Sequence, residues 1–208
     1  MKNRNANVYI YWDFDDVLGK THAQFLYLLK YIYGYVPENN VFLTPDNTNG
    51  HLADILTQAT FMRSTALDYP ALRALQTLRE MHPQFKHGLA THRGYHANGE
   101  INTRKLLSDY DLMFDSYHFI DPAHHRNKMA YLRALHQADD MVVLIDDNTY
   151  YDHTAYPNSL TVLVDKPWNQ HVITADPKLR VSTSEIYTAV VNGLSRFYPE
   201  VTHHESAA

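Results

Sequence analysis

The sequence contains no cysteine, and this absence is the first limit on its chemistry. Without thiols the chain forms no disulfide, no thiolate metal site and no cysteine nucleophile. Cysteine-free composition is typical of a reducing compartment, and we expect the cytoplasm. Long apolar runs are missing too, since none approaches the ~18 residues that span a membrane. Acidic residues follow the N-terminus too soon for a secretory signal, so we predict no membrane association.

Glycine and clustered positive charge are also scarce. The seven glycines form neither a GxGxxG motif nor a P-loop, which excludes the usual kinase and dinucleotide-binding patterns. The 18 Lys and Arg residues are scattered and the net charge is -5, so we expect no binding to long nucleic acid. The 14 histidines show no HExxH-like spacing and predict no zinc site. A small, nucleotide-sized ligand is compatible with this composition.

What the chain does contain is a series of short apolar runs separated by helical patterns. The runs that predict strands are 8–12, 86–90, 141–145 and 160–164, with a weaker one near 117–120. Continuous rather than alternating apolarity indicates strands that are covered on both faces. Helical spacing fills 21–34, 52–59, 70–78, 128–135 and 186–194, with capping boxes predicted at Thr21/Gln24 and Ser182/Glu185. We therefore predict an α/β fold with a Rossmann-like open parallel sheet.

About fifty residues separate the first strand from the helix at Pro70, more than one crossover needs. We assign residues 19–66 to a small helical cap inserted after the first strand, and residues 1–18 and 67–208 to the α/β core domain. The cap segment is rich in aromatic residues, namely Phe25, Tyr27, Tyr31, Tyr33, Tyr35, Phe42 and Phe61. We expect most of these rings to form the core of the cap, although stacking against a nucleobase is an alternative for any of them.

Polar residues gather where the predicted strands end, which is where ligands bind in open α/β sheets. They are Asp13, Asp15 and Asp16 after the first strand, Thr91, His92 and Arg93 after the second, and Asp146, Asp147 and Asn148 after the third, with Lys128 opening a helix. Each group alone is compatible with a turn or a helix cap. Their combination at several strand ends favours a catalytic site.

The acidic residues predict a bound cation. Three carboxylates within four positions repel one another, and a divalent ion relieves that repulsion. Carboxylates without cysteine favour Mg²⁺, held by Asp13, Asp15 and Asp146 or Asp147. Asp13 can then attack phosphorus, while Asp15 protonates the leaving oxygen and later deprotonates water. Thr91 and Lys128 would bind the phosphoryl oxygens.

The set DFDDVL, LATHRG, a lone Lys128 and VLIDDN resembles the four motifs of the haloacid-dehalogenase-like superfamily over nearly the whole chain. The resemblance implies Asp13 as nucleophile, Asp15 as acid/base, and Thr91, with His92 beside it, and Lys128 as phosphate binders. It also implies Asp13, Asp146, Asp147 and the backbone carbonyl of Asp15 as metal ligands. Asp16 departs from the family pattern, since Gly is usual there.

Val17-Leu18, the paired Asp146-Asp147 and the segment 164–169 resemble the 5'(3')-deoxyribonucleotidase branch, although His92-Arg93 replaces its usual Ser-Pro. We therefore expect a magnesium-dependent phosphatase that acts on a small phosphorylated substrate, a nucleoside monophosphate. The alternatives are a phosphatase on nucleic-acid ends or another phosphoester, and a non-catalytic binding protein of the same fold. Dehalogenation does not need Asp15. Arg93 has two alternative roles, contact with a ligand or a structural role. The sequence does not indicate the oligomeric state.

Overall fold

The computed structural model describes residues 7–37, 42–148, 156–172 and 176–197. Its strands are β1 (Val8–Trp12), β2 (Lys86–Thr91), β3 (Ser116–Phe119), β4 (Met141–Asp146), β5 (Ser159–Val164) and β6 (Arg180–Val181). They form one sheet in the order β3-β2-β1-β4-β5-β6, and every strand pair is parallel. The predicted open parallel sheet is confirmed. The short edge strand β6 was not predicted.

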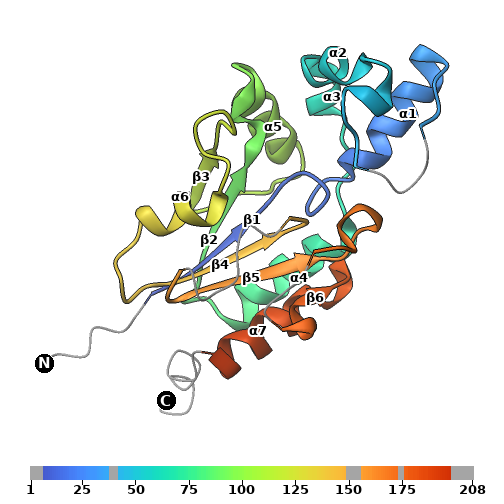
Figure 1. Ribbon diagram of the computed structural model, residues 1–208. Coiled ribbons are helices and arrows are strands. Elements are labelled where there is room, and N and C mark those ends of the chain that lie inside the picture. The colour runs from blue at the N-terminus through green and yellow to red at the C-terminus, as the bar shows by residue number, and fades with distance from the viewer. Residues whose placement is uncertain (1–6, 38–41, 149–155, 173–175, 198–208) are drawn as a thin grey trace, which may run out of the picture.

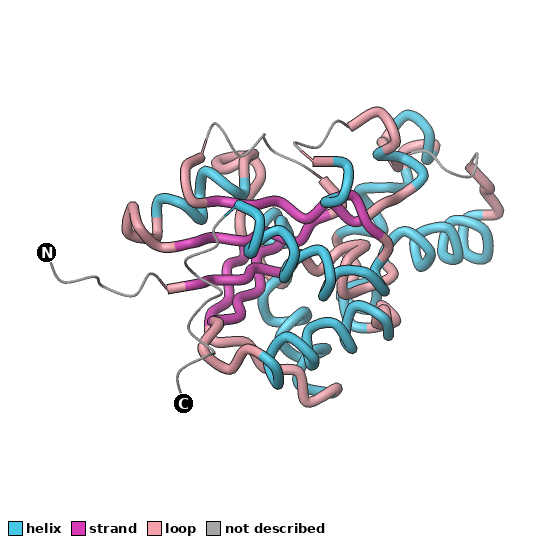
Figure 2. Tube along the Cα trace, turned by 90° about the horizontal axis from the view of Figure 1, so that it is seen from below, coloured by secondary structure: helices cyan, strands magenta, loops and turns pink. Residues whose placement is uncertain are grey.

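The helices are α1 (Thr21–Tyr33), α2 (His51–Leu56), α3 (Ala59–Arg63), α4 (Tyr69–Met81), α5 (Gly99–Asp109), α6 (Lys128–Ala134) and α7 (Ile186–Phe197). Figure 2 shows the strands as one layer with helices on either side. Ile10 and Trp12 of β1 pack in one core with residues of α4, α5 and α7, while Tyr11 points to the other face and packs with α6. The continuous apolarity of the strands therefore reflects burial on both faces.

Helices α1, α2 and α3 form a group of their own beside the sheet (Figure 1). Their buried side chains, with Leu43 from the segment between α1 and α2, make a third, separate apolar cluster of Phe25, Leu29, Leu43, Ile55, Phe61 and Met62. The chain enters and leaves this group at one place, where Gly19 bridges Leu67 and the amide of Asp68 donates to the carbonyl of Leu18 at 2.8 Å. We call residues 19–66 the cap.

The predicted helix caps and helix boundaries are partly confirmed. The Ser182/Glu185 capping box is present, and Gly34 follows the end of α1 in a left-handed conformation. The predicted Thr21/Gln24 box is wrong, because Thr21 lies inside α1 and its hydroxyl donates to Asp15. The predicted helix 52–59 is broken, since α2 ends at Leu56. Helix α5 was not predicted, because two of its five buried residues are polar.

Candidate active site

A buried lysine joins two aspartates at the centre of the sheet edge. Asp13 follows β1, Asp146 ends the neighbouring strand β4, and Lys128 begins α6. The ammonium nitrogen of Lys128 lies 2.7 Å from Asp13 Oδ2 and 2.8 Å from Asp146 Oδ2. All three side chains are buried, so their charges interact at low effective dielectric. Parallel pairing of β1 and β4 sets this geometry, because it brings their carboxyl ends side by side.

Asp147 adds a third carboxylate to this group. One carboxylate oxygen from each of Asp13, Asp146 and Asp147 lies within 4.8 Å of the others. Burial raises the pKa of Asp13 to about 7, with Lys128 opposing the shift and Asp146 and Asp15 adding to it. The pKa values of Asp146 and Asp147 rise to about 6, chiefly through burial. With all three ionised, one ammonium faces three carboxylates, so the donor set suits a hard cation.

Asp15 lines the same cavity as Asp13 but is held by a different cation, Arg93, the second residue of η2 (His92–Tyr95). The guanidinium donates to Asp15 Oδ1 through Nε at 3.0 Å and through Nη2 at 2.7 Å. Thr21 donates to the same oxygen at 2.7 Å. Burial would raise the pKa of Asp15, but Arg93 and these hydrogen bonds together hold it below its usual value.

Arg93 itself is buried, with 1% of its surface exposed, and it connects several elements. Nη1 donates to the carbonyl of Met62 in the cap and to Thr103 in α5, each at 3.2 Å. The guanidinium lies 4.1 Å from the centre of the Phe14 ring. These contacts engage all three guanidinium nitrogens within the protein, so of its two open roles Arg93 takes the structural one.

The turn after Asp13 places Asp16 in the left-handed region, with φ of 59°. Asp tolerates this conformation better than most residues, and Gly adopts it freely, which accounts for the departure from the family pattern. Asp16 Oδ1 accepts from the amide of His22 in the first turn of α1 at 2.9 Å. Burial, with added repulsion from Asp147 and Asp15, raises the pKa of Asp16 to about 8.

The predicted phosphate binders of the second motif lie close to Asp15 and Lys128. Thr91 is fully buried at the end of β2, and its hydroxyl oxygen lies 3.4 Å from Asp15 Oδ2 and also accepts from the amide of Arg93. His92 Nε2 lies 3.1 Å from the carbonyl of His125, which can only accept. Burial, with Lys128 adding to it, lowers the pKa of His92 to about 4. A neutral His92 gives the predicted phosphate contact no electrostatic support.

Two adjoining cavities open at these strand ends. The first, of about 480 Å³, is lined by Asp13, Asp15, Lys128, Asp146 and Asp147 among others. The second, of about 250 Å³, lies between core and cap and is mainly apolar. We call them the catalytic cavity and the apolar cavity. Asp15, Phe42 and Trp168 line both, so the two adjoin around these side chains.

Trp168 is the site residue whose role the sequence did not assign. It lies in a turn of 3₁₀ helix after β5 (η3, Pro167–Asn169), and its indole N–H donates to Asp147 Oδ2 at 2.9 Å. Its ring centre lies 4.3 Å from that of His22 in the cap. The adjacent Asn169 donates to the backbone carbonyl of Asp147 at 2.7 Å. The segment 164–169, noted only for its resemblance, therefore supports one of the candidate metal ligands.

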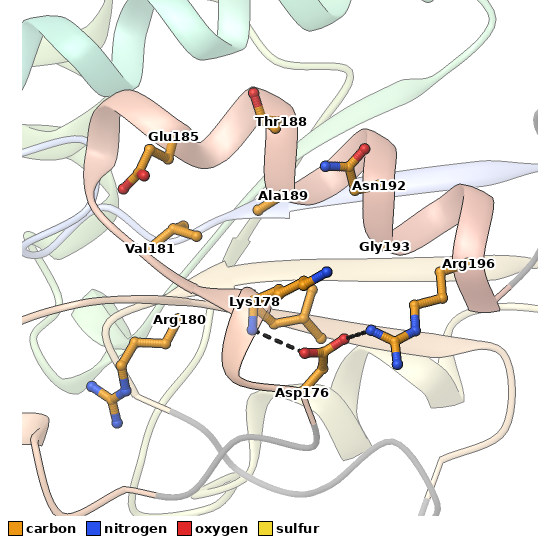
Figure 3. Close-up of a pocket in the computed structure, with 11 residues that line it drawn as sticks. Asp176, Lys178, Arg180, Val181, Glu185, Thr188, Ala189, Asn192, Gly193 and Arg196 are labelled. Atoms are coloured by element: carbon orange, nitrogen blue, oxygen red, sulfur yellow. Dashed lines mark hydrogen bonds and ion pairs between the residues drawn. The ribbon is translucent and has the colours of Figure 1, made fainter.

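A larger pocket, of about 790 Å³, lies elsewhere between β6 and α7, and we call it the groove. Figure 3 shows the side chains that line it. Asp176 accepts there from the guanidinium of Arg196 and from the amide of Lys178. Among the residues that the structure describes, none that lines this groove also lines the catalytic or the apolar cavity. The conjunction of carboxylates and buried cations therefore places the candidate site at the strand ends rather than in this groove.

No protein-family model matches the sequence, and no curated protein matches it. A haloacid dehalogenase-like hydrolase from Xanthomonas campestris is similar in structure, with a TM-score of 0.54 at 13% identity, over 90% of this chain and 96% of its own. A 2-haloacid dehalogenase from Pseudomonas syringae pv. Tomato gives a TM-score of 0.47 at 15% identity, over 90% and 99%. The Xanthomonas structure shows that this chain has a fold of the haloacid-dehalogenase type, and fold alone does not define a reaction.

In the part of the chain that the structure describes, no helix has both the length and the apolarity to cross a membrane.

Proposed function

We propose that the protein is a magnesium-dependent phosphomonoester hydrolase that acts through a phosphoaspartyl intermediate on Asp13. The observation that carries the proposal is the buried Asp13–Lys128–Asp146 group, with Asp147 beside it and Asp15 lining the same cavity. Asp13, Asp146 and Asp147 would hold Mg²⁺, which would neutralise charge on the phosphoryl oxygens. The role of the Asp15 carbonyl as a further ligand stays a prediction from the family resemblance.

The residues divide the reaction into two displacements. In the first, an oxygen of Asp13 bonds to phosphorus as the bond to the leaving oxygen breaks, and Asp15 supplies the proton to that oxygen. In the second, Asp15 takes a proton from water as the water oxygen bonds to phosphorus and releases Asp13. Lys128 balances charge on the phosphoryl oxygens. Because Arg93 favours the ionised form of Asp15, the arrangement suits the second displacement better than the first.

A nucleoside monophosphate is the substrate class that we propose. Phe42 and Trp168 line both cavities, and an aromatic ring at such a place can stack on a nucleobase, which contributes on the order of 1–3 kcal/mol. Asp13 is buried, which favours a compact free nucleotide over the end of a nucleic acid. Competition by short oligonucleotides separates these two substrates, because only an enzyme that acts on nucleic-acid ends would bind them well.

Phosphate release from ribo- and deoxyribonucleoside monophosphates and from an aryl phosphate, with and without Mg²⁺, tests the proposal. We expect Mg²⁺-dependent release that falls by on the order of 10³-fold or more in Asp13→Asn, because the nucleophile is lost. Asp109→Asn makes the same chemical change at the exposed end of α5 and should retain wild-type activity. If the folded wild type releases phosphate from none of these substrates, the protein is a binding protein and the proposal is wrong.

A further inference from the structure

The apolar cavity adjoins the catalytic cavity at the residue that transfers the proton. Asp15, the residue to which we assign proton transfer, lines both cavities together with Phe42 and Trp168. A phosphoryl group placed against Asp13 therefore has its leaving oxygen toward Asp15. The group bonded to that oxygen extends past Asp15 and Trp168 into the apolar cavity.

The walls of the apolar cavity are mainly hydrocarbon and come mostly from the cap. They consist of Phe25, Phe42, Leu43, Leu52, Leu56 and Phe61, with Tyr95 and Trp168 from the core. Its volume of about 250 Å³ is below the ~300–1,000 Å³ of pockets for drug-sized ligands. It therefore suits a group about the size of one ring system.

The charges around the apolar cavity are unfavourable to an anion. Among the described residues that line it, the basic side chains are His22 and Arg93. The three guanidinium nitrogens of Arg93 already donate to Asp15, Met62 and Thr103. Burial, with Lys166 adding to it, lowers the pKa of His22, so this imidazole supplies no charge near neutral pH. Asp15 also lines this cavity, and its carboxylate takes up the charge of Arg93, so the lining offers no unpaired cation to a bound anion.

We infer that the apolar cavity is the leaving-group subsite and that it selects phosphomonoesters whose leaving group is an uncharged ring system. This inference rests on the proposed hydrolysis and narrows its substrate class. A second phosphate or a carboxylate on the leaving group would be desolvated there, and Arg93, the cation of the lining, is already paired with Asp15, so burial of the added charge is strongly unfavourable. Nucleoside monophosphates satisfy the rule, whereas bisphosphates and phosphorylated acids do not.

Three benzyl phosphates test the inference. In each of them the leaving oxygen is benzylic, so the compounds differ only in the group at the para position. They are benzyl phosphate, 4-carbamoylbenzyl phosphate and 4-carboxybenzyl phosphate, of which the last two have nearly the same shape and differ in charge. We expect wild-type kcat/KM to be on the order of ten- to a hundredfold higher for the carbamoyl than for the carboxyl substrate. Benzyl phosphate should be hydrolysed at least as well as the carbamoyl substrate.

Variants that add a cation to the cavity should weaken this preference. Phe42 is 67% exposed at the edge that both cavities share, so Phe42→Arg brings in a cation with little loss of packing. Leu56→Arg places a cation on the wall formed by α2 and guards against failure of the first variant. Each should lower the carbamoyl-to-carboxyl ratio by about tenfold. Met81→Arg, at an exposed position near the end of α4 that lines neither cavity, should leave the ratio unchanged.

The outcomes separate this inference from the proposed function. Equal kcat/KM for the carbamoyl and carboxyl substrates in the wild type would overturn the inference and leave the hydrolase intact. The same conclusion follows if Phe42→Arg and Leu56→Arg both retain the wild-type ratio. Absence of turnover on all three substrates would overturn the inference alone if nucleoside monophosphates are hydrolysed, and together with the proposed hydrolysis if they are not.

Discussion

Asp13 and Asp15 lie two residues apart and line one cavity, yet their surroundings carry opposite balances of charge. Around Asp13, one buried ammonium serves three carboxylates, and the pKa of Asp13 is raised to about 7 by burial. Around Asp15, Arg93 pairs with a single carboxylate, and the pKa of Asp15 is lowered. The Asp13 group, with one ammonium for three carboxylates, has too little positive charge, and we call it the incomplete group. The Asp15–Arg93 pair has one cation for one carboxylate, and we call it the complete pair.

This difference separates the two groups by what each can do. A buried group with excess negative charge is stabilised when a cation binds, so it is suited to a metal ion. An ion pair in which each charge has its partner is different, because removal of either member destabilises the folded protein. We therefore interpret the Asp13 group as a site that a metal ion completes and the Asp15–Arg93 pair as a fixed part of the architecture.

The largest effect should follow removal of Arg93, which leaves Asp15 without its partner. In Arg93→Met, Asp15 loses its cation, and the Met62 carbonyl and the Thr103 hydroxyl lose a donor. Because the Asp15 side chain is 32% exposed while Arg93 is buried, we expect the free energy of unfolding to fall by about 3 kcal/mol, the low end of the range for broken buried pairs. Urea denaturation at neutral pH measures this change.

Lys128→Met provides the matched comparison, because it removes a buried cation from the incomplete group. Mg²⁺ should restore most of the stability that Lys128→Met loses, since the ion supplies charge at the same carboxylates. It should restore little in Arg93→Met. Equal recovery of both variants in Mg²⁺ would show that the two groups do not differ in this way.

A smaller effect concerns the stability of the wild type as pH changes. The pKa of Asp13 is raised to about 7, and those of Asp146 and Asp147 to about 6, from the usual 3.8. The unfolded chain therefore releases these protons first, and the metal-free protein loses stability as pH rises from about 4 to about 7.

Mg²⁺ should offset this loss, so its stabilising effect grows with pH. At a concentration of 100 Kd the ion would add about 2.7 kcal/mol. Thermal unfolding should therefore show a larger Mg²⁺-induced rise in Tm at about pH 7.5 than at about pH 5. Asp146→Asn should reduce the difference between the two pH values. A rise in Tm that is the same at both pH values would contradict the raised pKa of these carboxyls.

The smallest effect should come from the residue that supports Asp147. Trp168→Phe keeps an aromatic ring against His22 but removes the N–H that donates to Asp147 Oδ2. We expect the Mg²⁺ concentration for half-maximal activity to rise by about tenfold, as for other residues that orient metal ligands. The preference among the benzyl phosphates should remain. An unchanged Mg²⁺ requirement would mean that Asp147 needs no such support.

The incomplete group was largely predictable from the sequence, and the complete pair was not. Short apolar runs locate β1 and β4, and parallel strands bring the residues at their carboxyl ends to one edge, so Asp13 and Asp146 were expected at the same edge. The structure adds that β1 and β4 pair directly. The pairing of Arg93 with Asp15 depends instead on the path of a turn and on contacts with α5 and the cap. No periodic pattern encodes such a path.

Thr21 illustrates the same limit at the level of one residue. Its spacing to Gln24 matches a capping box, yet tertiary structure uses its hydroxyl to bind Asp15. The buried residues of α5 include Asn102 and Thr103, so the apolar stripe that would have predicted this helix is short. In both cases polar side chains serve distant partners, and a local reading of the sequence cannot recognise them.

The single junction of the cap has a consequence for how such a protein can change. Because the backbones at Leu18 and Asp68 are hydrogen-bonded to each other, a short turn between these two residues could close the core without the intervening helices. Exchange of that segment for another would replace most of the apolar walls while β1, β4 and α6 keep their places. New specificity could therefore be acquired through one insertion point, without rebuilding the residues that carry out the reaction.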